Sequence, residues 1–242
     1  MTAADLTVAA AYATPGDAPA LRGWADRLGI PCAALDQDQA ADLWLVMERG
    51  MLSLRDRRGR GLKALSVDLD SPEPASKKQL LGRAVGRRTR TVVDATAGWG
   101  DDSRRLLAMG YSVTLLERNP LMAALLHNAA QRAASPPVVV ECEAIDYLVE
   151  HPAAWDCVYL DPMFPPKRRS STLARRKMRL LRELAGDDPD RGELFAAAGT
   201  AAARRVVVKR PDHHEPLAGR PAETVAGKLV CYDVYFTQGA RA

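Results

Sequence analysis

The sequence predicts an α/β protein whose main sheet is covered by helices on both faces and is preceded by a small α+β N-terminal unit. Three observations support this fold class. Apolar runs of strand length alternate with helical segments from Thr91 onward. Those runs are continuous, which is typical of parallel strands that are buried on both faces. The chain has 242 residues, of which 47% are hydrophobic, so it can bury a core of the size that this fold needs.

The composition divides the chain into two predicted domains, a small α+β domain at 1–75 and the larger domain at 76–242. In the first domain, strand-like and helical patterns are separated by glycines that favour turns and helix ends. The expected elements are a weak strand at Thr7–Ala10, a helix over Ala18–Leu28 ended by Gly29, a β-hairpin of Trp44–Met47 and Met51–Leu54 around Glu48-Arg49-Gly50, and a connector rich in Pro, Ser and Asp at 66–76.

The second domain shows strands and helices in alternation. Asn119 and Pro120 are favourable residues for the N-cap and the first position of a helix. The expected strands are Thr91–Asp94, Ser112–Leu116, Val138–Val140, Cys157–Leu160, Arg205–Lys209 and Leu229–Phe236. The expected helices are Lys77–Val85, Asp101–Met109, Pro120–Arg132 and Leu173–Leu184.

Several classes of protein are disfavoured by the sequence. No apolar run is long enough for a membrane span, and the N-terminus has no Lys or Arg before its apolar stretch, unlike a secretory signal. The four cysteines form no CxxC pair, so neither a metal site nor a disulfide framework is indicated. We therefore expect a cytoplasmic protein. The net charge of +4 is compatible with a nucleic-acid partner but does not require one.

A glycine-containing loop follows the first strand of the larger domain. It runs from Asp94 through Gly98 and Gly100 to Asp101 and Asp102, in a D-x-x-x-G-x-G pattern. Glycines let a backbone pass close to a ligand at the carboxyl end of a strand. In class I methyltransferases, a loop of this pattern accepts the methionine part of S-adenosylmethionine (SAM). The spacing excludes a P-loop, and an ordinary glycine-rich turn is the alternative interpretation.

An acidic residue, Glu117, ends the second strand about 20 residues after the glycine loop, which is the usual place for an acid that bonds a ribose diol. The alternative is a surface glutamate favoured by the dipole of the following helix.

The segment Asp161-Pro162-Met163-Phe164 directly follows another strand. It is similar to the D/N-P-P-F/Y motif of amino-methyltransferases. Asp161 and the carbonyl of Pro162 are expected to accept hydrogen bonds from an exocyclic amine, while Phe164 stacks on the base. Two acceptors at the amine protons favour the pyramidal nitrogen that attacks a methyl sulfonium. The alternative is a proline-rich turn without a catalytic role.

Basic residues cluster after this loop and after a later strand. A run of positive side chains is usually a solvated face, but this one adjoins the predicted base pocket, which favours contacts with phosphates. The residues expected to bind RNA are Lys167, Arg168, Arg169, Arg175, Arg176, Lys209 and Arg210.

Four strings, VVDATAGWGDD, LLERNPLMAALL, YLDPMFPPKRRS and RVVVKRPD, closely resemble the ribosomal small-subunit methyltransferase J family. The resemblance implies a class I Rossmann-like fold and SAM-dependent methylation of the N2 amine of a guanosine in 16S ribosomal RNA, with that RNA or the small subunit as partner. It also implies cofactor contacts by Asp101-Asp102, Glu117-Arg118, Glu143-Ala144 and Asp161. Two positions depart from the family pattern, which tends to have a basic residue at Asp101 and a serine pair at Glu143-Ala144.

Other functions stay open at this point. A D-P-x-F loop also serves amino-methyltransferases that act on adenine N6 or on glutamine. A non-catalytic RNA-binding assembly factor that kept the fold is a further alternative. An NAD-dependent dehydrogenase is disfavoured because the chain has no G-x-G-x-x-G pattern.

Overall fold

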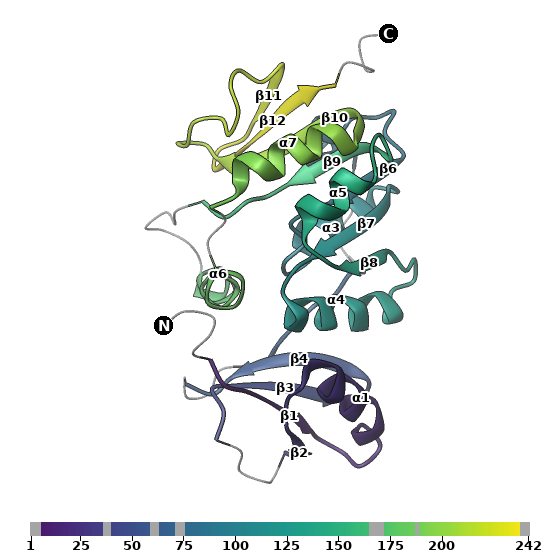
Figure 1. Cartoon of the computed structure of the whole chain (residues 1–242), viewed down its shortest axis with the longest axis vertical. Helices are drawn as coiled ribbons and strands as arrows, with labels where there is room; N and C mark the ends of the chain where they lie inside the picture. The colour runs from purple at the N-terminus through teal and green to yellow at the C-terminus, as the bar shows by residue number, and fades with distance from the viewer. Residues whose placement is uncertain are drawn as a thin grey trace.

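Two β-sheets organise the chain in a computed structural model that describes residues 6–35, 40–58, 63–70, 76–164, 172–186 and 189–237 (Figure 1). The first sheet has the strand order β2-β1-β3-β4-β5, and the second has the order β11-β12-β10-β9-β6-β7-β8. No helix in these ranges is long and apolar enough to cross a membrane.

The first sheet and helix α1 form the N-terminal part of the structure. Its elements are β1 (Val8–Tyr12), α1 (Ala18–Leu28), β2 (Cys32–Ala34), β3 (Leu43–Glu48), β4 (Met51–Asp56) and β5 (Leu65–Ser66). The predicted helix is confirmed, as is the predicted hairpin. Arg49 and Gly50 both have positive φ angles, 50° and 75°, which are typical of a two-residue hairpin turn. The short strands β2 and β5 were not predicted.

The second sheet begins with five parallel strands. Its strands are β6 (Thr91–Asp94), β7 (Ser112–Glu117), β8 (Val138–Glu141), β9 (Trp155–Leu160), β10 (Ala202–Pro211), β11 (Glu223–Ala226) and β12 (Val230–Phe236). Strands β8, β7, β6, β9 and β10 are parallel, and β12 and β11 continue the sheet antiparallel. All six predicted strands are present, and β11 is an addition at the edge of the sheet.

Helices pack on both faces of this sheet, which confirms the predicted fold class. The helices are α2 (Leu80–Val85), α3 (Asp101–Ala108), α4 (Pro120–Arg132), α5 (Ala144–Glu150), α6 (Thr172–Ala185) and α7 (Arg191–Ala201). Buried residues of α2, α3 and α4 belong to one hydrophobic cluster, and those of α5 and α7 belong to another. Helix α2 is shorter than predicted, since 76–79 form a turn that precedes it. Helices α5 and α7 were not predicted.

The two sheets share one hydrophobic core, in which α4 packs against both β4 and β8 (Figure 1). The Asn128 side chain of α4 accepts a hydrogen bond from the backbone N–H of Leu52 at 2.9 Å and donates to the carbonyl of Gly50 at 3.0 Å. The expected connector also contributes to this core, because Val67 and Leu69 are buried. The division of the chain at residue 75 stays a prediction.

Candidate active site

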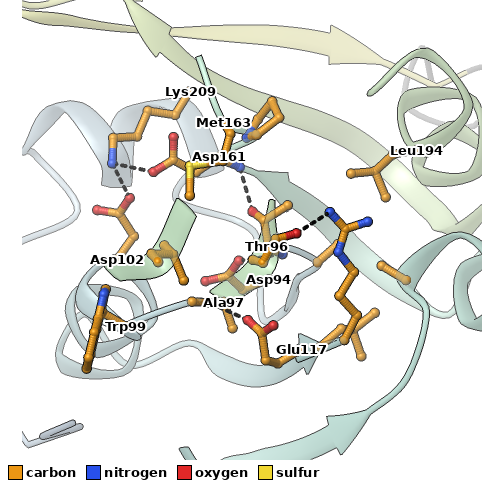
Figure 2. A pocket seen from close by; sticks show the side chains of 18 of the residues that line it. Asp94, Thr96, Ala97, Trp99, Asp102, Glu117, Asp161, Met163, Leu194 and Lys209 are labelled. Atoms are coloured by element: carbon orange, nitrogen blue, oxygen red, sulfur yellow. Dashed lines mark hydrogen bonds and ion pairs between the residues drawn. The ribbon is translucent and has the colours of Figure 1, made fainter. Parts of the chain in front are cut away.

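A cavity of about 850 Å³ opens at the carboxyl ends of the parallel strands (Figure 2). This is the edge at which open α/β sheets bind their ligands. Most of the residues expected in a site line it together: Asp94, Gly98, Asp101, Asp102, Glu117, Arg118, Glu143, Ala144, Asp161, Pro162, Phe164, Lys209 and Arg210. The structure thus brings these predicted residues to one place, although several of them have other contacts than expected.

The glycine loop has backbone conformations that suit glycine. Gly98 and Gly100 have φ angles of 50° and 69°. A Cβ atom added at Gly98 would lie 3.1 Å from Leu181 Cδ2 of α6, and one added at Gly100 would lie 3.0 Å from Leu69 Cδ2. Gly98 therefore faces the cavity, whereas Gly100 allows the loop to pack closely on the buried segment that follows β5.

Asp94 is buried at the end of β6 and holds the glycine loop in shape. Its carboxylate accepts hydrogen bonds from the Ser103 hydroxyl at 2.5 Å and from the Thr96 backbone N–H at 3.1 Å. Burial raises the pKa of Asp94 to about 7, and the charges of Asp102 and Asp161 act in the same direction. These hydrogen bonds are those of a residue that shapes the loop, although Asp94 also lines the cavity.

Glu117 lies at the end of β7 and joins the second strand to the loop. Its Oε2 accepts the Gly98 backbone N–H at 2.9 Å, and its Oε1 accepts the Asn119 backbone N–H at 2.8 Å. A carboxylate offers about four lone-pair sites, so these bonds are compatible with further bonds to ribose hydroxyls. The Asn119 side chain caps α4 by accepting from the Leu121 and Met122 backbone N–H groups, which fixes the turn that carries Glu117.

The residues expected to complete the cofactor site lie beside Glu117. The backbone N–H of Cys142 donates to the Glu117 carbonyl at 3.1 Å, so the first turn of α5, with Glu143 and Ala144, reaches the cavity. Arg118 pairs with Asp190 at 3.4 Å. Asp101 is more exposed and pairs with Lys177 of α6 at 3.1 Å.

The Asp161–Phe164 segment leaves β9 and is held from several sides. The Asp161 backbone N–H donates to Thr96 Oγ1 of the glycine loop at 2.7 Å. Pro162 is buried, and the Phe164 ring centroid lies 5.2 Å from that of His214. Arg182 of α6 donates to the Phe164 carbonyl. These contacts fix the direction of the segment relative to the glycine loop.

Lys209, Asp102 and Asp161 meet beside this segment (Figure 2), and the Tyr159 hydroxyl joins them. The Lys209 ammonium lies 2.6 Å from Asp102 Oδ2 and 2.7 Å from Asp161 Oδ2, and the Tyr159 hydroxyl donates to Asp102 Oδ2 at 2.7 Å. Burial disfavours the charged form of Asp102, but the charge of Lys209 and hydrogen bonds from Lys209 and Tyr159 outweigh it and lower the pKa. Two carboxylates thus share one ammonium.

The basic residues expected to bind RNA differ in placement. Lys209 turns into the cavity, and Arg210 forms a buried pair with Asp233, with Nε 2.6 Å from Oδ2. Arg176 donates to the Lys63 carbonyl. Lys167, Arg168 and Arg169, together with the side chain of Arg175, lie outside the described residues.

Sequence reasoning missed several residues of the site. Thr96 anchors Asp161, and its only sequence signal is a hydroxyl inside the glycine loop. Tyr159 is fully buried in β9, and its place in an apolar strand predicts only a core residue. The cavity wall formed by Met178 and Leu181 of α6 follows from the packing of that helix and has no local signal.

Comparison with known proteins decides the family. The family described as "Putative SAM-dependent methyltransferase" matches residues 30–237. A Pseudomonas aeruginosa (strain LESB58) protein named Ribosomal RNA small subunit methyltransferase J is 38% identical over 91% of each chain. A protein of the same name from Thioalkalivibrio sulfidiphilus is 44% identical over 66% of this chain and 69% of its own. The chain belongs to the ribosomal RNA small subunit methyltransferase J family.

A solved structure extends the comparison. The SAM-dependent methyltransferase from Neisseria gonorrhoeae superposes with a TM-score of 0.69, at 27% identity, over 96% of this chain and 97% of its own. This member of the methyltransferase J family is accordingly a SAM-dependent methyltransferase, and the predicted resemblance, enzyme class and cofactor are confirmed.

The residues present fit SAM. The cavity is within the range of volumes that enclose a ligand of this size, with a glycine loop at one side and the Glu117 carboxylate at another. We propose that the loop around Gly98 holds the methionine end and that Glu117 holds the ribose. SAM supplies an electrophilic methyl group on a sulfonium, and the chain's own residues bind and orient the reactants.

Proposed function

We propose that this enzyme methylates the exocyclic N2 amine of a guanosine in 16S ribosomal RNA, within the small ribosomal subunit or its RNA. The observation that carries this proposal is the Asp161–Phe164 segment, which lines the same cavity as the glycine loop and Glu117. The relatives that cover most of the chain are named for methylation of small-subunit ribosomal RNA. A cytoplasmic location follows from such a substrate.

The proposed chemistry depends on the orientation of the target amine. An exocyclic amine is a weak nucleophile because its lone pair is delocalised into the ring. Acceptors at the Asp161 carboxylate and the Pro162 carbonyl would draw its protons out of the ring plane and direct the lone pair at the methyl group. Bound SAM would supply the methyl group and leave as the thioether S-adenosylhomocysteine, and the proton lost by the amine nitrogen would pass to solvent. Catalysis is therefore by positioning and electrostatics, with no covalent intermediate.

We propose that Phe164 stacks on the base that is presented to Asp161. Its ring lies in the cavity lining, with His214 on one side and the Arg191 guanidinium 5.8 Å from its centroid. A base must leave its stack to reach such a pocket, and an aromatic platform compensates for part of that cost.

We propose that the phosphates are held by the basic segment after this loop, through Lys167, Arg168, Arg169, Arg175 and Arg176. Contacts of this kind are independent of sequence and weaken as salt is added. They position the RNA, while the cavity selects the nucleotide.

The substrate is tested by following radiolabelled methyl groups from SAM into small ribosomal subunits, naked 16S RNA, DNA and protein in parallel. We expect incorporation into the ribosomal RNA fraction, and nucleoside mass spectrometry of that RNA should show N2-methylguanosine that disappears when the gene is deleted. N6-methyladenosine, methylglutamine, or no incorporation at all would contradict the proposal, and the last outcome would favour the assembly-factor alternative.

The role of Asp161 is tested by Asp161→Ala. We expect methyl transfer to be abolished with the melting temperature nearly unchanged, because the side chain is partly exposed. The matched control is Asp26→Ala on the exposed face of α1, which should retain activity. Full activity of Asp161→Ala would refute the assignment.

A further inference from the structure

Lys209 lines the cavity beside Asp161 but has no part in the proposed chemistry. Lys209 comes from β10, and its side chain is only 21% exposed. It reaches the end of β9, where the reacting segment begins, and forms ion pairs there with two carboxylates from different elements. A lysine is rarely buried unless its charge is matched, so this arrangement needs an explanation.

The partners of Lys209 differ in how firmly they are held. Asp102, on the first turn of α3, is 8% exposed and also accepts the hydroxyl of Tyr159, which is fully buried. Asp161 is 36% exposed and lines the cavity. Asp102 and Tyr159 therefore anchor the ammonium from the core side, and the ammonium in turn holds the more accessible carboxylate.

The charge balance explains why Lys209 matters to Asp161. Asp102 and Asp161 bond the same ammonium, so without it two negative charges would face each other in a poorly solvated place. The other titratable groups nearby are Asp94 on β6, Tyr232 on β12 and Arg105 on α3. Arg105 brings a positive charge to Asp102, with Nη1 3.4 Å from Oδ1, whereas Lys209 is the cation that bonds both carboxylates. Burial opposes the charged form of Lys209, but Asp161 and Asp102 outweigh it and raise its pKa, so the ammonium stays charged.

We propose that Lys209 is a positioning residue for methyl transfer, which keeps the Asp161 carboxylate ionised and pointed at the target amine. This proposal rests on the proposed role of Asp161. It gives Lys209 a task inside the cavity and replaces the expectation that this side chain binds a phosphate of the RNA. Asp102 and Tyr159 support it by fixing the ammonium.

The main test is Lys209→Met, which keeps the length of the side chain and removes its charge. We expect kcat at pH 7 to fall at least about tenfold, as for loss of a group that orients a catalytic carboxylate. We also expect the acid limb of the kcat profile to move to higher pH, because Asp161 loses the cation that favours its charged form. Lys228→Met, at the exposed turn between β11 and β12, is the matched control and should change neither quantity.

A phosphate contact makes a different prediction. Loss of such a contact would raise KM for the RNA and reduce the slope of its salt dependence by about one, with kcat unchanged. That result for Lys209→Met would overturn the proposal.

Two further variants separate this role from folding and from the role of Asp161 itself. Lys209→Met leaves the buried Asp102 with the more distant Arg105 as its cation, 3.4 Å away. The double variant Lys209→Met/Asp102→Asn removes that buried charge and should melt closer to the wild type. It should keep part of the shift of the acid limb, because Asp161 still lacks the ammonium. If the double variant folds and its profile matches that of the wild type, the proposal is wrong.

A double-mutant cycle tests whether Lys209 acts through Asp161. In an Asp161→Asn background, we expect Lys209→Met to lower kcat by less than about twofold, since coupled residues are not additive. Full additivity would refute the proposal for Lys209 alone. Full activity of Asp161→Asn and of Asp161→Ala would instead refute the proposed role of Asp161, so the two failures are distinguishable.

Discussion

The glycine loop provides a sharp test of the cofactor assignment through Gly98→Ala. Gly98 has a φ angle of 50°, and its backbone N–H donates to Glu117 Oε2 at 2.9 Å. An alanine in this left-handed conformation costs about 1–2 kcal/mol. The added Cβ would also lie 3.1 Å from Leu181 Cδ2, so the Leu181 side chain must shift by a few tenths of an ångström.

The strain can be relieved if the loop rotates to a negative φ angle, but the bond to Glu117 is then lost. A hydrogen bond to a charged group is worth about 1.5–3 kcal/mol. A loop that has rotated away must re-form this geometry to hold SAM, which costs at least about 1.4 kcal/mol of binding free energy, a factor of ten in an equilibrium constant. We therefore expect the Kd for SAM to rise at least about tenfold, measured by calorimetry.

The matched control is Gly110→Ala. Gly110 has a φ angle of 83°, and an added Cβ there would meet no atom within 4 Å. The Gly110→Ala variant should lose about 1–2 kcal/mol of folding stability from the same backbone strain, and it should bind SAM with the wild-type Kd. If Gly98→Ala loses a similar stability yet binds SAM within about twofold of the wild type, the loop does not hold the cofactor as we reason.

Three further predictions concern the surroundings of the site. Asp233→Ala leaves the buried guanidinium of Arg210 without its carboxylate partner, so we expect the free energy of unfolding in denaturant to fall by about 3–5 kcal/mol. The pKa of Asp94 is about 7 in the folded protein against an ordinary 3.8, so between these pH values the folded state binds a proton that the unfolded state has lost. The stability of the fold should therefore decrease as the pH rises from about 4 to 7. Asp94→Asn should remove this pH dependence of the melting temperature. Asn128→Ala should lower the free energy of unfolding by about 2–3 kcal/mol, because the buried Leu52 N–H and the Gly50 carbonyl lose their hydrogen bonds to this side chain. An unchanged melting temperature would contradict this prediction.

The order of strands and helices could be predicted because each element carries its own local signal. The Asn119-Pro120 start and the Gly29 end are confirmed as helix boundaries. Helix α7 was missed because Arg191–Ala201 is rich in alanine and its apolar residues do not gather on one face. Strand β11 was missed because Glu223–Ala226 is short and polar, and pairs only at the edge of the sheet.

The positions of the main site residues could be predicted for a similar reason. Glu117 and Asp161 each stand directly after a parallel strand, and the carboxyl ends of such strands meet at one edge of the sheet. What the sequence could not reveal is the contact between side chains that are far apart in the chain. The bond from the Asp161 backbone to Thr96 and that from Tyr159 to Asp102 arise only when these elements pack together.

The same distinction explains Lys209 and Arg210, which are adjacent in the sequence and look alike there as a basic pair. In a strand, neighbouring side chains point to opposite faces, so each must find its own partner. Lys209 meets Asp102 from α3, and Arg210 meets Asp233 from β12. The role of a positive residue at the end of a strand next to an active site therefore cannot be assigned until its acidic partners are known. In this enzyme, the charges available for an RNA partner are better sought on the segment after Phe164 than on β10.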